Sequence, residues 1–288
     1  MSLGIAFKGA EGIVLAADSR VTLLAVVQLP GLKVPAGTQL VVPATFDNAT
    51  KLINSKSQGH IAAVTFGAGA IGQKEPRTAA SFMPEFDSKL AKELADTNEK
   101  NQRLTVEEFA KKLGDFFSYQ WNKAAMPTQG IDDMIFFVAG YDDERAPYGR
   151  LYEVRVPSHP APTEFLAGQF GAIWGGQREV TDRLLQGFDP NLPMLVQEHL
   201  DTPSADRAKA ADALAVKLRE KLTIPIPWQF LPLQDCVDLC ICLLRTTITM
   251  QKWVVGIRGV GGAIDLATIT QSGGFTAVQQ KKISGEQL

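Results

Sequence analysis

The stretch that most constrains the fold is residues 1–18, MSLGIAFKGAEGIVLAAD. Leu3, Ile5 and Phe7 alternate with small or polar residues, which predicts a half-buried strand. The segment 12–17 is almost continuously apolar, as expected of a strand covered on both faces. Glycines between the two segments predict a tight turn and therefore an antiparallel hairpin. If the turn is centred on Ala10, paired positions sum to twenty and Ser2 lies beside Asp18.

Ser2 is a candidate nucleophile because a small second residue permits removal of Met1. Removal would leave a free α-amine next to the Ser2 hydroxyl. An α-amine has an ordinary pKa of about 8, so it can take the proton of the hydroxyl near neutral pH. The plainer alternative is that Ser2 is an ordinary second residue, and its position alone does not decide between the two.

Two further motifs bear on whether Ser2 is a nucleophile. They are Asp18-Ser19-Arg20-Val21-Thr22 and Thr50-Lys51-Leu52. With these residues the chain resembles the proteasome β-subunit family of N-terminal-nucleophile hydrolases. It looks most like the standalone bacterial members, particularly the betaproteobacterial proteasome homologues. The likeness runs, with insertions, from residue 2 to about residue 270.

The resemblance implies a catalytic group in which the acid at Asp18 holds the lysine at Lys51 next to Ser2. It also implies a substrate cleft; the expected substrate-binding residues are Arg20, Thr22, Thr65 and Gly67. The implied fold is an α+β four-layer α/β/β/α sandwich of antiparallel sheets. The implied assembly is a homo-oligomer of stacked rings that hydrolyses polypeptides without a metal or other cofactor, with an ATP-dependent unfoldase as a candidate partner.

The chain departs from the family pattern at three positions that are usually polar. Ile257 and Val260 stand where the family has an aspartate and a serine that orient the nucleophile, and Gly175 stands where a serine lies near the amine. Loss of positioned polar groups commonly costs about a hundredfold in rate. We therefore expect slow turnover on ordinary peptides.

We expect a single domain over residues 1–271, followed by a tail over 272–288. Two stretches interrupt the family pattern: a Pro-containing loop or hairpin at about 24–46, and a largely helical insertion at about 193–222. The first insertion also holds Lys33, the alternative to Lys51 as the catalytic lysine. Lys51 is preferred because an apolar pair comes directly after it, as in the family.

Other patterns predict the elements around the cleft. Apolar strands are expected at 60–66, 134–139 and 151–156, and an amphipathic helix begins after Thr105, which forms a capping-box pattern with Glu108. A helix is expected from Gly176 to Gln186, and a buried one over 233–251.

Residues 67–72 match the dinucleotide fingerprint G-x-G-x-x-G. A dinucleotide site would also need a second parallel strand ending in an acidic residue about 20 residues further on. The segment after the glycines, residues 74–96, instead has a helical pattern interrupted by proline. This pattern argues against nucleotide binding.

Bulk composition excludes several function classes. Hydrophobic residues make up 45% of the chain, charged residues 21%, and the formal net charge is -2, so nothing favours binding to nucleic acid or to an anionic membrane. The sequence has neither a membrane-spanning run nor a signal-peptide pattern, and we expect a cytoplasmic protein. Cys236, Cys240 and Cys242 are expected to be buried thiols, since no histidine lies near them in sequence.

Two other hypotheses remain open on the sequence alone. One is an N-terminal-nucleophile amidohydrolase that acts on a small amide, with the two insertions reshaping the pocket. The other is a ring scaffold with weak or no activity, which the residues at Ile257, Val260 and Gly175 favour.

Overall fold

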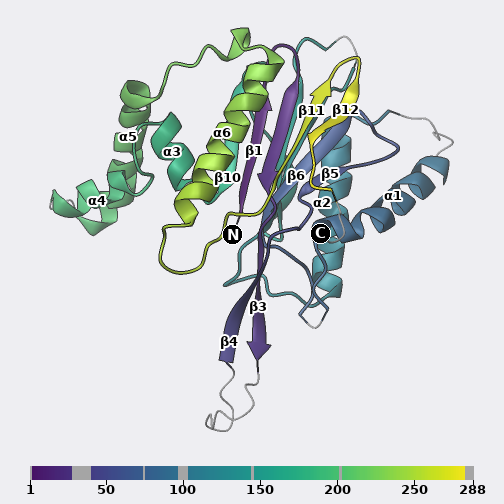
Figure 1. Ribbon diagram of the computed structural model, residues 1–288, viewed down its shortest axis with the longest axis horizontal. Coiled ribbons are helices and arrows are strands. Elements are labelled where there is room, and N and C mark those ends of the chain that lie inside the picture. Colours follow the sequence, from purple (N-terminus) through teal and green to yellow (C-terminus); the bar gives the residue numbers. More distant parts are fainter. Residues whose placement is uncertain are drawn as a thin grey trace, which may run out of the picture.

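The structure is a computed structural model that describes residues 2–27, 40–73, 75–96, 103–143, 146–200 and 203–282. It is a mixed α+β structure built on two five-stranded antiparallel sheets (Figure 1). The first sheet has the order β10-β1-β2-β11-β12, with the bounds β1 Leu3–Lys8, β2 Ile13–Asp18, β10 Gly171–Gly176, β11 Ile264–Thr270 and β12 Gly274–Gln279. The second sheet runs β5-β6-β7-β8-β9, with the bounds β5 Leu52–Asn54, β6 Ile61–Gly67, β7 Met134–Gly140, β8 Arg150–Val156 and β9 His159–Glu164.

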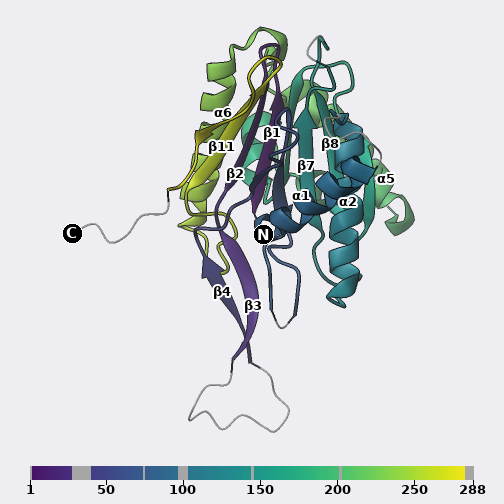
Figure 2. The same cartoon turned by 90° about the vertical axis from the view of Figure 1, so that its right-hand side faces the viewer.

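The two sheets pack face to face, and helices cover their outer faces (Figure 2). Helix α6 (Leu233–Gln251) packs on the first sheet through Cys236, Val237 and Leu244. Helices α1 (Ala79–Asp96) and α2 (Val106–Lys123) cover the second sheet with a cluster of aromatic side chains. The buried helix expected over 233–251 is therefore confirmed.

Strands β1 and β2 lie in the middle of this packing, and alternate side chains of each strand enter different cores. Leu3, Ile5 and Phe7 face α6, whereas Ala6 faces the second sheet. Every residue of β1 is buried, Lys8 included. The prediction that β1 is half-buried is wrong, because its small residues also face a packed surface and not solvent.

The first predicted insertion forms a hairpin in its described part. Strands β3 (Val21–Val27) and β4 (Leu40–Phe46) pair with each other in a separate two-stranded sheet that projects from the sandwich (Figure 1). Lys33, the alternative catalytic lysine, lies outside the described residues.

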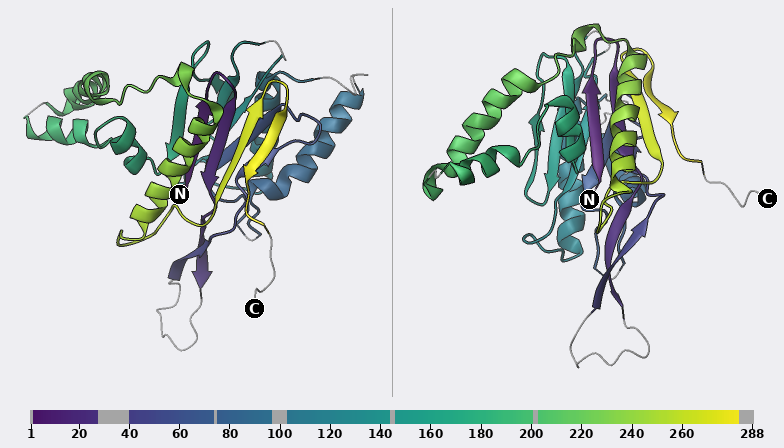
Figure 3. Two further views of the ribbon diagram at one scale, coloured as in Figure 1. Left: turned by 45° about the horizontal axis from the view of Figure 1, so that its top comes forward. Right: turned by 60° about the vertical axis from the view of Figure 1, so that its left-hand side comes forward.

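The second predicted insertion contains two helices. They are α4 (Leu192–His199) and α5 (Ser204–Leu222), which contact each other and stand away from the sandwich (Figure 3). Ala211 is buried, but most of α5 is exposed. A short 3-10 turn, η1 (Trp228–Phe230), leads back to α6.

Three expectations need correction. The helix expected from Gly176 begins later, as α3 (Glu179–Leu185), because Gly171–Gly176 forms strand β10 at the edge of the first sheet. Strand β9, which contains two prolines, was not expected. The tail expected from residue 272 instead starts with β12, which pairs with β11, so ordered structure continues past residue 271.

The glycines at 67–72 do not belong to a dinucleotide-binding unit. Strand β6 pairs with β5 and β7 in antiparallel fashion, and the next helix begins only at Ala79. The geometry lacks the parallel strand-helix-strand unit that phosphate binding at such a motif requires.

Helix α2 begins with the predicted capping box. The Thr105 Oγ1 accepts the Glu108 N–H at 3.2 Å, and the Glu108 carboxylate accepts the Thr105 N–H at 2.8 Å. These bonds satisfy two polar groups that a helix start otherwise leaves open.

We expect Thr105→Ala to lower the free energy of unfolding by about 1 kcal/mol, because the side-chain acceptor of the cap is lost. Chemical denaturation monitored by circular dichroism measures the change. Thr105→Ser keeps the hydroxyl and serves as the matched control. Equal stability of the two variants would contradict a stabilising role for the cap.

Candidate functional site

Ser2 lies at the start of β1 and is held by the edge strand β10. The Ser2 carbonyl accepts the Gln177 N–H at 2.8 Å, and Ser2 is only 2% exposed. Gly176 has φ +93°, and a Cβ atom there would lie 1.9 Å from the Ser2 carbonyl oxygen. Only glycine therefore allows β10 to approach the Ser2 backbone this closely.

The β1–β2 register differs by one residue from the predicted one. Gly9 donates to the Gly12 carbonyl across a two-residue loop, and Gly4 pairs with Ala17, so paired positions sum to twenty-one. A turn centred on Ala10 is thus wrong, and Ser2 does not lie directly opposite Asp18. A shift of one position changes which residues face each other across the whole hairpin.

Asp18 reaches the site through its carboxylate. The side chain is fully buried and accepts three backbone N–H groups, those of Leu3, Arg20 and Gly261, each at 3.0 Å. Leu3 belongs to β1, Arg20 lies directly before β3, and Gly261 lies in the turn before β11. One carboxylate therefore links the β1–β2 hairpin to a turn 243 residues further along the chain.

Lys51 joins Ser2 to Asp18. Its Nζ donates to the Ser2 Oγ at 2.7 Å and to the Asp18 Oδ1 at 2.7 Å, and the residue is 5% exposed. The Lys51 carbonyl accepts the Thr65 N–H at 2.9 Å, which holds the lysine against β6. The structure thus brings together the three residues expected to be catalytic, with the lysine between the other two.

Burial lowers the pKa of Lys51, and the adjacent Asp18 carboxylate opposes that shift. An ammonium group at this position donates to the Ser2 Oγ and favours negative charge on that oxygen. The arrangement can therefore stabilise an alkoxide at Ser2, while a separate group must accept the Ser2 proton.

A second buried ion pair lies next to the site and was not foreseen. Lys281 contacts the Asp265 carboxylate with its Nζ, which also donates to the Ser19 Oγ at 3.1 Å, and Asp265 is 1% exposed. Asp265 lies on β11, whereas Lys281 lies in the expected tail. No local pattern in the sequence signals their contact.

The four residues expected to bind substrate have different surroundings. Arg20 forms a two-point ion pair with Asp47, at 2.5 and 2.8 Å, so its guanidinium is engaged within the chain. The Thr22 Oγ1 is buried and has no hydrogen-bond partner among the described residues. Neither Arg20 nor Thr22 lines a hollow next to Ser2.

Thr65 and Gly67 lie closer to Ser2, on β6. The Thr65 Oγ1 is buried without a hydrogen-bond partner among the described residues, and Thr65 lines a crevice together with Ser2 and Lys51. Gly67 has φ +85°, and a Cβ atom there would lie 2.1 Å from the Asp133 carbonyl oxygen. Glycine at position 67 therefore allows the Asp133 backbone to lie close to it. The Asp133 carbonyl also accepts the Ala68 N–H at 2.8 Å.

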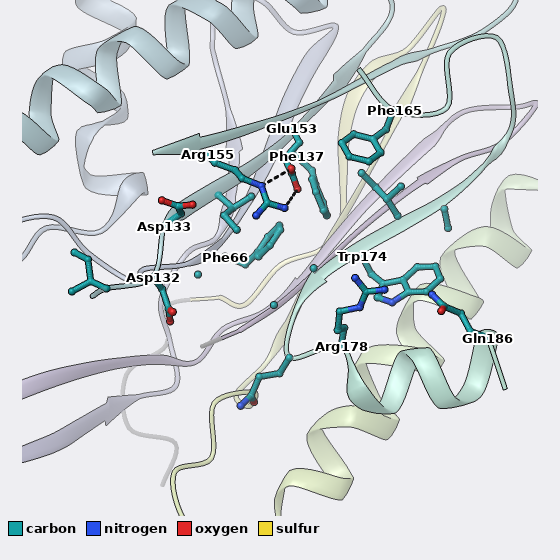
Figure 4. Close-up of a pocket in the computed structure, with 18 residues that line it drawn as sticks. Phe66, Asp132, Asp133, Phe137, Glu153, Arg155, Phe165, Trp174, Arg178 and Gln186 are labelled. Atoms are coloured by element: carbon teal, nitrogen blue, oxygen red, sulfur yellow. Dashed lines mark hydrogen bonds and ion pairs between the residues drawn. The ribbon is translucent and has the colours of Figure 1, made fainter. Parts of the chain in front are cut away.

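Two hollows of very different size lie near Ser2, and Ser2 lines the smaller one. The crevice at Lys51 has a volume of about 10 Å³, which is close to the space that one water molecule needs. A second cavity of about 770 Å³ opens between the sheets at the β10 edge and is lined by Gly175, Gly176 and Gln177 (Figure 4). The sequence does not reveal this cavity, because its walls come from segments that are well separated along the chain.

Phe66 separates the two hollows and lines both. Its ring lies over Gly4 and Gly175, which are paired neighbours on β1 and β10, and a Cβ atom at either glycine would lie 2.5 Å from a ring carbon. Phe66 also packs edge-to-face on Phe137. The space that a side chain at position 175 would need is thus filled by an aromatic ring from the opposite sheet.

The other two departures from the family pattern supply no polar side chain either. Ile257 is 46% exposed, whereas Val260 is fully buried in the core beneath the first sheet.

The three cysteines of α6 are free thiols. Cys236 and Cys240 are fully buried as expected, and burial raises the pKa of Cys236 to about 11. The expectation of burial is wrong for Cys242, which lies on the exposed face of the helix. Within the described ranges, no three His, Cys, Asp or Glu side chains gather as they would around a metal ion. No helix of the described segments has both the length and the apolar character needed to cross a membrane.

Comparison of the chain with models of known protein families, and with curated proteins, finds no match in either case.

We expect Gly175→Ser to lower the free energy of unfolding by about 1–3 kcal/mol, because its Cβ atom overlaps the Phe66 ring. Replacing Phe66 by Leu in the same chain should recover part of this loss. Denaturation of the two single variants and the double variant measures the coupling. Additive effects would show that the ring and position 175 do not compete for space.

Proposed function

We propose that the chain is an N-terminal-nucleophile hydrolase that cuts amide bonds of peptides with Ser2 after removal of Met1. The observation that carries the proposal is the position of the Lys51 Nζ, 2.7 Å from both the Ser2 Oγ and the Asp18 Oδ1. A buried lysine held by a carboxylate and directed at a hydroxyl is suited to activating that hydroxyl as a nucleophile.

In the proposed reaction the Ser2 Oγ attacks the substrate carbonyl carbon, and its proton passes to the α-amine. The amine then gives the proton to the nitrogen of the departing product, which leaves an ester on Ser2. Water attacks the ester, restores the Ser2 hydroxyl and releases the acid product. Lys51 stays charged and stabilises the oxygen of Ser2, and Asp18 holds Lys51 in place.

The family resemblance extends the proposal to the fold and the assembly. Helices packed outside two facing antiparallel sheets are what a four-layer α/β/β/α sandwich requires. This arrangement supports our proposal that the chain has the N-terminal-nucleophile hydrolase fold. We also propose that it forms a homo-oligomeric double ring in the cytoplasm that encloses its sites, as proteasome-like peptidases do.

A small-amide hydrolase is the second candidate, and the size of the Lys51 crevice favours it. About 10 Å³ leaves no room for a large side chain next to Ser2 and Lys51. Assays with a panel of short peptides and with simple acyl amides distinguish the candidates, since only the peptidase should cleave the peptides.

We expect cell-made protein to lack Met1 and to form an adduct with a peptide epoxyketone, which reacts with a hydroxyl and a free amine on the same residue. Intact-mass spectrometry measures both events. Ser2→Ala is the control and should give no adduct. Retention of Met1 would exclude both hydrolase proposals, and an unreactive Met1-free chain would favour the inactive scaffold.

We expect Lys51→Met to reduce the rate of adduct formation by about a hundredfold or more, because the charge at the Ser2 Oγ is lost. The same change leaves the buried Asp18 carboxylate without its cation and should cost about 3–5 kcal/mol of stability. Denaturation curves of Lys51→Met and of the unchanged chain measure the loss of stability. Adduct rates taken under conditions where both chains are folded measure the loss of rate separately, and equal rates would contradict the role of Lys51.

The pH dependence should show two limbs. The rate should rise as the α-amine loses its proton near its ordinary pKa of about 8. It should fall again as Lys51 loses its proton, at a pH below the ordinary lysine value because burial lowers the pKa of Lys51. A pH profile of adduct formation measures both limbs, and in Lys51→Arg the alkaline limb should disappear. Persistence of that limb would assign it to another group.

A further inference from the structure

We propose that the cavity between the sheets recognises a bulky, positively charged part of the substrate, such as a guanidinium or amidinium group on an apolar stem. The inference rests on the proposed hydrolase function and adds a substrate class to it. It starts from a size difference: the crevice at Lys51 holds about 10 Å³, whereas the cavity holds about 770 Å³, within the range of small-molecule sites. Of these two hollows, only the cavity is large enough to take the bulky part of a substrate.

The cavity lies close to the nucleophile, although Ser2 itself does not line it. Gly176 and Gln177 line it, and the Gln177 N–H donates to the Ser2 carbonyl. Phe66 forms part of its wall and also borders the crevice that contains Ser2. A group bound in the cavity is thus separated from Ser2 only by the β10 backbone and one aromatic ring.

Part of the cavity wall is aromatic, and charged and polar side chains form the rest. The aromatic lining consists of Phe66, Phe137, Phe165 and Trp174. Phe66 and Phe137 are nearly buried and contact each other edge-to-face. Such walls suit an apolar stem or ring, and the electron-rich faces of the rings attract a cation.

The charged groups around these walls leave a negative excess. Arg155 is held by Glu153 at 2.7 and 3.1 Å (Figure 4). Arg178 is held by Asp182 at 2.6 and 3.1 Å, so both guanidinium groups are already paired. Asp182 also accepts the Trp174 Nε1–H at 2.8 Å. Neither arginine is available to neutralise a further carboxylate fully.

Two more carboxylates line the cavity, those of Asp132 and Asp133. Asp133 is bonded to the Ser158 N–H and hydroxyl and lies near Arg155. Asp132 is exposed, and its carboxylate has no hydrogen-bond or ion-pair partner among the described residues. The Asp133 carbonyl accepts the Ala68 N–H, which anchors the backbone next to Asp132. The Asp132 carboxylate is therefore open to a cationic ligand at the cavity.

The first test measures binding without catalysis, on Ser2→Ala protein. The probe is benzamidine, an aromatic cation, and the comparison compound is benzamide, which has nearly the same shape without the charge. We expect benzamidine to bind about tenfold more tightly or better, measured by calorimetry. Its binding should change Trp174 fluorescence, and Trp174→Phe should remove that change. Equal affinity for the two compounds would overturn the proposal.

The second experiment tests whether the Asp132 carboxylate is responsible for the preference for the cation. Asp132→Asn should weaken benzamidine binding by roughly three- to fivefold and leave benzamide binding unchanged. Asp212→Asn is the matched control, because Asp212 is an exposed aspartate on α5. A preference for benzamidine that survives Asp132→Asn undiminished would overturn the role of Asp132.

The third arm uses active, Met1-free protein and peptides that differ only in carrying arginine, its neutral analogue citrulline or glutamate beside the cleaved bond. We expect the arginine peptide to be cleaved fastest. Cleavage without that preference would overturn the proposed substrate class. Binding of benzamidine together with no cleavage of any peptide would instead overturn the hydrolase function and leave the cation site in place.

Discussion

The ion pair between Lys51 and Asp18 is the interaction on which the rest of the structure depends. Removing two charges from water is costly, so such a pair persists only where further hydrogen bonds satisfy it. Asp18 receives three backbone N–H groups in addition to the Lys51 ammonium. These donors come from β1, the residue before β3 and the turn before β11, while Lys51 leads into β5 of the other sheet. The pair therefore joins the two sheets at the end where Ser2 lies.

Phe66 determines how the space next to this pair is divided. The ring rests on Gly4 and Gly175 and forms a common wall of the narrow crevice and the wide cavity. A serine at position 175 and a large aromatic residue at position 66 compete for the same volume. The Phe66 ring therefore accounts both for the lack of a side chain at position 175 and for the aromatic wall that the crevice and the cavity share.

Much of the fold can be predicted from sequence patterns, and the failures have physical reasons. The α2 capping box and the apolar repeat of α6 are local signals, and the structure confirms both helices. The one-residue error in the β1–β2 register arose because Gly9 and Gly12 flank a two-residue loop, and periodicity alone does not locate its centre. Strand β10, with the sequence GAIWGG, lacks alternation, since its glycines are needed for contacts with Phe66 and Ser2. The Lys281–Asp265 contact and the cavity depend on tertiary packing alone.

The contacts that Lys51 makes have a consequence for how such a site would mature. Its ammonium reaches the side-chain oxygen of Ser2 and the carboxylate of Asp18. Neither bond involves the nitrogen of Ser2, and both are present in the chain that still carries Met1. Exposing the amine would turn an amide nitrogen into a base and leave this charge network as it is. Under the proposed function, the chain is a precursor whose activation is a covalent event and not a conformational one.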